Sequence, residues 1–113
     1  MANYPDTYDQ ELIRAIKQLK SQQEIQHFLR DILTITEIKE TAKRFQIAKL
    51  LWLGDKSYLE IADELDTSTT TVTRVADWLF NKDLNGYQTV LKRLFPKHAP
   101  PKKPRKGSLK VFP

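Results

Sequence analysis

One stretch of the sequence concentrates side chains that can form directed hydrogen bonds. It reads TSTTTVTR, residues 67–74, and six of its eight residues are Ser or Thr. Hydroxyl groups can donate to or accept from the edge of a nucleic-acid base, and the guanidinium of Arg74 can donate to a guanine edge or to a phosphate. The same composition also suits a Ser/Thr-rich linker, so the flanking segments have to decide between a folded surface and an unfolded one.

The flanking segments place these hydroxyls at the start of a helix. Ile61 and Leu65 before the stretch, with Val72 and Val75 after its turn, have the spacing that pins together the two helices of a helix-turn-helix. The small Ala62 suits the point where such helices cross. The sequence therefore predicts a helix-turn-helix over about residues 57–80.

The predicted turn, residues 66–68, leads into the helix that would meet DNA. Asp66 stands where such turns usually have Gly, and Asp adopts the left-handed conformation less readily than Gly does. Ser68 is the predicted N-cap, and the start of a second helix of this kind contacts base edges in the major groove. The predicted DNA contacts are Lys56, Ser68, Thr69, Thr70, Thr73 and Arg74. The alternative for each Thr is a hydrogen bond to its own backbone.

The charge of the predicted motif does not favour DNA. Residues 57–80 hold five acidic side chains and one basic one, a balance of −4. Phosphate affinity must then come from other cations. These are Lys49, Lys56, Lys82, Lys92, Arg93 and the C-terminal segment. The same balance favours an alternative function, a helix-turn-helix that serves as a protein-interaction module without specific DNA readout.

The C-terminal segment, residues 96–113, is a basic tail rich in Pro and Lys. It carries six Lys or Arg and no acid, whereas the 1–95 segment holds all 14 acidic residues and has a charge of −1. Proline argues against a continuing helix. The tail is predicted to contact phosphates through Lys102, Lys103, Arg105 and Lys106. The alternative is a solvated tail.

The folded segment, residues 1–95, is predicted to be one all-α domain with about six helices. Helical apolar stripes run through residues 7–20 and 21–33, with capping boxes expected at Thr7 with Gln10 and at Ser21 with Glu24. A longer helix follows, capped by Thr34 or Thr36 and ended at residue 54 by Gly.

The rest of the domain completes the helix-turn-helix and adds one helix. Ser57 with Glu60 predicts a third capping box, residues 81–86 form a turn cluster, and a last helix over 87–95 ends before Pro96. The end of the long helix, residues 45–53, has almost no polar face, so it must be buried on all sides. A monomer of 113 residues can hardly cover it, which predicts an intimate homodimer.

Several function classes find no support in the sequence. The chain has no Cys and only two His, His27 and His98, and it has no Gly-rich loop and no cluster with metal-ligand spacing. We therefore expect no enzyme activity, no metal and no cofactor. No apolar run approaches the roughly 18 residues of a membrane span, and the N-terminus is not a secretory signal. The lack of Cys suits a reducing cytoplasm.

The middle of the chain resembles a known family. Residues 33–79, from LTITEIKE through SYLEIADEL to TSTTTVTRVADWL, resemble the Trp repressor superfamily, and specifically its YerC/YecD branch, and NGYQTVLKRL resembles the last helix of that branch. The resemblance covers about residues 9–95. It implies an all-α interlocked homodimer that binds operator DNA as a repressor, in the cytoplasm of a prokaryote and associated with the nucleoid.

The resemblance also implies a possible effector pocket. Arg44, Thr71 and Arg74 match the two arginines and the threonine that surround tryptophan in the Trp repressor. Val75 stands where that protein has a Gly that gives the indole room, and Trp78 stands where a Ser contacts the ligand's amino group. We therefore expect that free tryptophan is not the effector, and that the Trp78 indole could itself fill the cavity.

Overall fold

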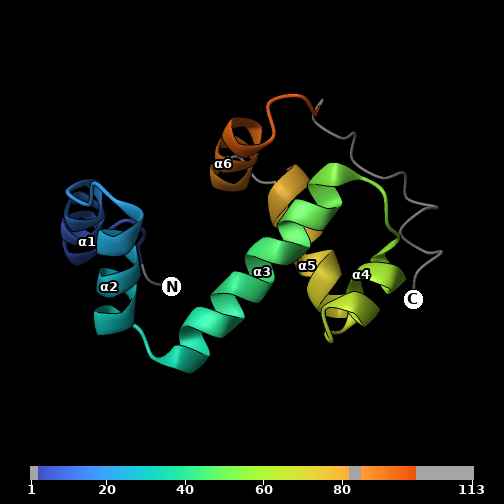
Figure 1. Ribbon diagram of the computed structural model, residues 1–113, viewed down its shortest axis with the longest axis horizontal. Helices are drawn as coiled ribbons and strands as arrows, with labels where there is room; N and C mark the ends of the chain where they lie inside the picture. Colours follow the sequence, from blue (N-terminus) through green and yellow to red (C-terminus); the bar gives the residue numbers. More distant parts are fainter. Residues whose placement is uncertain (1–2, 82–84, 99–113) are drawn as a thin grey trace. The chain divides into compact units, whose positions relative to one another are not determined.

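A computed structural model of the chain describes residues 3–81 and 85–98, and Figure 1 shows its helices along the sequence. The described residues form six α-helices and no strand, which confirms the all-α prediction. The helices are α1 (Thr7–Lys17), α2 (Gln22–Ile32), α3 (Ile35–Leu53), α4 (Tyr58–Glu64), α5 (Thr69–Asn81) and α6 (Gly86–Leu94). The chain divides into two compact units, and the boundary between them lies between residues 39 and 40, inside α3.

The first two helices begin at oxygen-bearing N-caps. In α1 the predicted box of Thr7 with Gln10 is wrong: Asp6 is the N-cap, its carboxylate accepts from the Asp9 backbone N–H at 2.8 Å, and the Asp9 side chain accepts from the Asp6 N–H at 2.9 Å. Asp is at least as good a cap as Thr, so the helix begins one residue earlier than the threonine pattern indicated.

The α2 cap is confirmed in part. Ser21 accepts from the Glu24 backbone N–H at 3.1 Å, as predicted. The Glu24 carboxylate does not complete the box, because it accepts from the N–H of Lys20, one residue before the cap, at 2.8 Å.

The long helix α3 begins and ends as the sequence indicates. Thr34 rather than Thr36 caps it, through a reciprocal pair with Glu37 in which each side chain accepts from the other's backbone N–H, at 3.1 and 2.9 Å. Hydrogen bonds from the backbone, and secondarily from the side chain, of Thr34 lower the pKa of Glu37. At the other end Gly54 has φ of +78°, a conformation that a residue without Cβ adopts without strain.

The second unit, from residue 40 onward, contains the hydrophobic core. Its buried side chains come from the end of α3, from α4, α5 and α6, and pack into a single cluster. They are Ile47, Ala48, Leu51, Trp52, Tyr58, Ile61, Ala62, Val72, Val75, Ala76, Leu79 and Leu91. The helix-pinning residues predicted from spacing are all in this cluster or packed against it, with Leu65 the partly buried member.

The apolar end of α3 does not have the partner that the sequence predicts for it. The apolar end of α3 is buried within the chain itself, because Ile47 and Ala48 are fully buried and Phe45 and Leu50 pack against the same cluster. Three short helices are enough to surround one helix end, so the apolar character of residues 45–53 does not require a second chain.

The first unit has the opposite property. Neither α1 nor α2 buries any residue, although both have an apolar stripe. Large apolar side chains along α1, α2 and the start of α3 are 36 to 51% exposed. They are Leu12, Ile13, Ile16, Ile25, Leu29, Ile32 and Ile35. Apolar side chains that remain exposed along amphipathic helices point to a site of association in a soluble protein.

Candidate nucleic-acid interface

The helix-turn-helix consists of α4, the turn at residues 65–68, and α5, which pack directly against each other. The predicted capping box at the start of α4 is confirmed: Ser57 accepts from the Glu60 N–H at 3.1 Å, and Glu60 accepts from the Ser57 N–H at 2.8 Å. The hydrogen bonds from Ser57 lower the pKa of Glu60. Apolar Ile61, Val72 and Val75 then bury the facing sides of the two helices.

The turn has a Schellman geometry at the end of α4. The Thr67 N–H donates to the Ala62 carbonyl at 2.9 Å, and the Asp66 N–H donates to the Asp63 carbonyl at 3.4 Å. Asp66, at the position such motifs reserve for Gly, has φ of +53°. From α3, the Lys43 ammonium donates to the Asp66 carbonyl at 3.3 Å. The left-handed turn predicted with Asp in place of Gly is therefore formed, and a lysine 23 residues away contacts it.

Several hydroxyls of the recognition helix, α5, are occupied by internal hydrogen bonds. Ser68 Oγ accepts from the Thr71 N–H at 3.1 Å, which confirms it as the N-cap, and lies 3.0 Å from Thr71 Oγ1. Thr73 Oγ1 donates to the Thr69 carbonyl at 2.9 Å. For Thr73 the alternative anticipated from sequence therefore holds, and its hydroxyl keeps only accepting capacity toward a partner. In the Ser68–Thr71 pair either hydroxyl can be the donor.

Two predicted contacts remain available on the outside of α5. Thr70 and Arg74 are exposed, and Thr69 is partly buried. Within the part of the chain that the structure describes, the Thr70 hydroxyl makes no side-chain hydrogen bond and Arg74 no ion pair. Thr70 can thus both donate and accept, and Arg74 offers a full set of donors.

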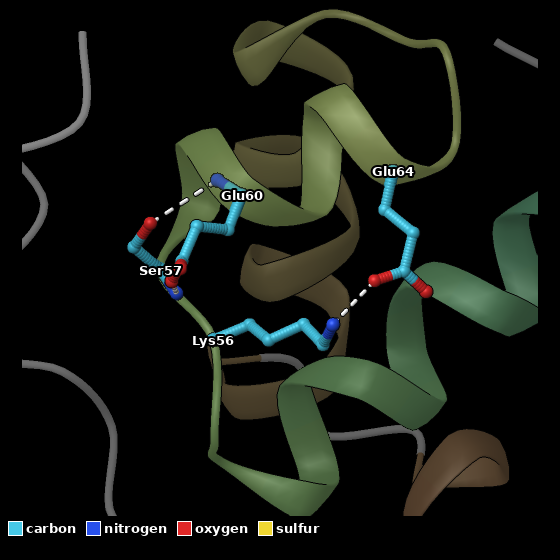
Figure 2. A network of polar contacts seen from close by, with 4 residues as sticks. All are labelled: Lys56, Ser57, Glu60 and Glu64. Atoms are coloured by element: carbon cyan, nitrogen blue, oxygen red, sulfur yellow. Dashed lines mark hydrogen bonds and ion pairs between the residues drawn. The ribbon is translucent and has the colours of Figure 1, made fainter.

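The predicted contact Lys56 lies just before α4 and is already paired. Figure 2 shows its side chain running along α4 to the Glu64 carboxylate, with which it forms an ion pair and a hydrogen bond. Both side chains remain partly exposed, at 40% and 46%. The hydrogen bond to Glu64, followed by the charges of Glu64, Glu60 and Asp55, raises the pKa of Lys56.

These contacts account for two of the five acidic residues of the motif. Glu60 faces the backbone of its own helix start, and Glu64 faces Lys56, so neither carboxylate is left without a local partner. Asp63 and Asp66 are exposed. One of the negative charges of residues 57–80 is therefore offset by Lys56, which lies just outside this range.

The residues of the predicted effector pocket meet around one cavity. Arg44 of α3 and Thr71 and Arg74 of α5 line a space of about 600 Å³, together with Val75, Trp78 and Tyr87. The expectation that the Trp78 indole fills this cavity is wrong: its side chain is 53% exposed, and it forms part of the wall.

Sequence reasoning missed Tyr87. It lies on α6 and also lines a second cavity of about 540 Å³, whose wall includes Phe45, Trp78 and Val90. Burial raises the pKa of Tyr87, and the Arg44 charge opposes part of that rise. No short-range pattern could indicate this role, because α3 and α6 meet only in the folded unit.

The other predicted phosphate contacts are scattered. The Lys49 ammonium lies 5.9 Å from the centre of the Phe95 ring, where it can form a cation–π contact. Lys92 and Arg93 lie in the last turn of α6. Lys82 and the tail contacts Lys102, Lys103, Arg105 and Lys106 lie outside the described residues.

Other site types find no support in the described ranges. No group of three His, Cys, Asp or Glu side chains there could hold a metal ion. None of the helices described is long and apolar enough to cross a membrane.

Comparisons with known proteins agree with this architecture. The family model described as Trp repressor protein matches residues 8–95. The uncharacterized protein YerC of Bacillus subtilis (strain 168) is 34% identical over 84 residues, which cover 74% of this chain and 79% of YerC. The crystal structure of a TrpR-like protein from Eubacterium eligens ATCC 27750 superposes with a TM-score of 0.72 at 37% identity, covering 80% of this chain and 91% of that one.

Proposed function

This chain belongs to the Trp repressor family, as a YerC-like member, and we propose that it is a transcriptional regulator that binds double-stranded DNA at specific sequences. The family is one of DNA-binding regulators and not of enzymes. The observation that supports specific binding is the exposed start of α5, where Thr70 and Arg74 stand free beside a fixed turn. These side chains can read base edges while the helix lies in the major groove.

We further propose that the regulator is a homodimer that acts as a repressor. The support for a dimer is the apolar face of the first unit, whose helices α1 and α2 bury none of their own residues. A second copy of the chain has the same apolar face, and an isologous interface buries the faces of both copies at once. Two recognition helices would then read half-sites about one helical turn of DNA apart.

Selection of bound duplexes from a random DNA pool tests this function. We expect enrichment of a palindromic site whose affinity for the protein falls steeply as salt rises. Removal of residues 97–113, which carry six positive charges, is expected to reduce that slope. Enrichment of no site would favour the second candidate, a protein-interaction module.

That second candidate is supported by the −4 balance of residues 57–80. The Lys56 partner of Glu64 weakens it, because a carboxylate that is paired with a cation repels phosphate less. In a protein-interaction module, Thr70→Ala would leave duplex affinity unchanged.

We propose that free tryptophan is not the effector. Val75 is 4% exposed and forms part of the wall of the cavity between Arg44 and Arg74, where the Trp repressor keeps a Gly. A branched side chain at this place takes room from an indole ring. Calorimetric titration with millimolar tryptophan is expected to give no saturable heat of binding. A saturable heat of binding would contradict the proposal.

A further inference from the structure

The Lys56–Glu64 pair has a bearing on DNA binding that neither residue has alone. Lys56 comes just before the N-cap of α4, the helix that in a helix-turn-helix crosses the DNA backbone. Helix α4 itself holds no Lys or Arg, so Lys56 is the basic side chain adjacent to the start of that helix. Figure 2 shows that the Lys56 ammonium points along α4 toward its last residue, Glu64.

We propose that the Glu64 carboxylate competes with DNA phosphate for Lys56. Because Glu64 holds Lys56 in the free protein, it weakens sequence-independent binding to DNA. The inference rests on the proposed function, because it concerns how the motif meets a duplex. A carboxylate and a phosphate both accept charge-assisted hydrogen bonds from an ammonium, so contact of Lys56 with DNA exchanges one anion for another.

The geometry favours competition over a purely structural role. Both side chains are close to half exposed, and exposed pairs contribute little to folding stability. An ammonium at this exposure can be reached by an incoming phosphate without unfolding of α4. The capping box of Ser57 and Glu60 does not depend on the pair, since it is formed by other atoms.

Asp63 provides a matched control. It is the neighbouring carboxylate of the same helix, is exposed, and forms no ion pair within the described part of the chain. Glu64→Gln and Asp63→Asn therefore change the net charge equally, but only Glu64→Gln releases Lys56. Any general effect of charge on DNA affinity should be common to both.

The experiment measures binding of the full chain to a labelled duplex of random sequence, at salt from about 50 to 200 mM. Glu64→Gln is expected to bind roughly two- to fivefold more tightly per chain than Asp63→Asn, the range that corresponds to an exposed ion pair. Its salt slope should be steeper by up to about one per chain, the full value being reached if Glu64 keeps Lys56 from every phosphate in Asp63→Asn. In a Lys56→Gln background the two variants should bind alike.

The outcomes separate the inference from the proposed function. Equal affinity and slope for Glu64→Gln and Asp63→Asn in the wild-type background overturn the competition. A Glu64→Gln variant that melts at a lower temperature and binds DNA more weakly than Asp63→Asn also overturns it, because the ion pair would then stabilise the fold. If the wild-type chain binds no duplex even at the lowest salt, the proposed function fails and the inference falls with it.

Discussion

Asp66 determines how the two helices of the motif are joined. Its φ of +53° closes the Schellman turn, and its carbonyl accepts from Lys43. An L-residue in the left-handed region carries strain, which for Asp is smaller than for most residues and for Gly is absent. The turn is thus formed by a tolerated residue and supported from α3.

We predict that the side chain at position 66 controls stability through this strain. Asp66→Val is expected to lower the free energy of unfolding by about 1–2 kcal/mol, because a β-branched residue fits the left-handed region poorly. Asp66→Gly should leave it within about 1 kcal/mol of the wild type. Urea unfolding measures both, and Asp63→Val, in helical backbone, is the control. A larger loss for Asp63→Val than for Asp66→Val would contradict the assignment of strain.

A second residue-scale prediction concerns the hydroxyls of α5. Thr70→Val removes an uncommitted hydroxyl and should weaken binding to a selected operator by about 1 kcal/mol, near fivefold. Thr73→Val should weaken it less, because the Thr73 hydroxyl proton is donated to the Thr69 carbonyl. Both variants keep the shape of Thr. Binding to the operator and to random duplex is compared for each, and an equal loss in the two variants would show that Thr73 reorients on DNA.

At the scale of elements, α3 and α4 begin with the same device. Each has a hydroxyl N-cap and a Glu three residues later, and in both the hydrogen bonds lower the pKa of that Glu. A carboxylate whose pKa is depressed on folding adds stability above its unfolded pKa and loses it as pH falls through the folded pKa. The two helix starts should therefore weaken together in acid.

We predict a pH dependence that isolates one of these caps. At about pH 7, Glu60→Gln should be less stable than the wild type, since Gln reaches the Ser57 N–H without the charge. At about pH 3, below the ordinary glutamate pKa of about 4.3, the difference should shrink because the wild-type carboxyl is becoming protonated. Thermal unfolding at both pH values measures it, with Asp63→Asn as control. A difference that stays constant with pH contradicts the capping role of the charge.

The features of the fold that could be predicted from the sequence are those set by neighbouring residues. Several features depend on residues a few positions apart, where spacing is informative. They are the α2 cap at Ser21, the α4 capping box, the end of α3 at Gly54, and the burial of Val72 and Val75. At α1 the same reasoning chose the wrong cap, because Asp6 and Thr7 are both good candidates.

Contacts between residues distant in the sequence could not be predicted in the same way. Lys43 meets the Asp66 carbonyl across 23 residues, and Tyr87 joins Arg44 at a cavity between helices distant in sequence. The sequence predicts that a second chain buries residues 45–53, because apolar periodicity shows that a face is covered without showing which element covers it.

At the scale of the whole molecule, the two units differ in how they are stabilised. The second has a core of its own, whereas α1 and α2 present apolar stripes without burying a residue. In a chain of 113 residues such a surface is costly to leave in water. A self-associated state would remove that cost.

We predict that a charge on this face disrupts the proposed dimer. Leu29→Asp is expected to shift the protein to monomer in sedimentation equilibrium, and to lower a melting temperature that in the wild type rises with protein concentration. His27→Asp, at an exposed position on another side of α2, should remain dimeric. A wild-type chain that is monomeric at all concentrations would contradict the proposed assembly, and equal effects of the two variants would place the interface elsewhere.

The internal hydrogen bonds of the recognition helix limit how much information it can read. With the Ser68 and Thr73 hydroxyls engaged inside the chain, few polar groups are left to distinguish base pairs. Each mismatch costs roughly 1–3 kcal/mol, while a chromosome offers about 10⁶–10⁹ competing positions. A single short half-site would recur by chance many times. If the proposed function holds, occupancy of the correct locus depends on a fixed distance between two half-sites and on the number of protein copies in the cell.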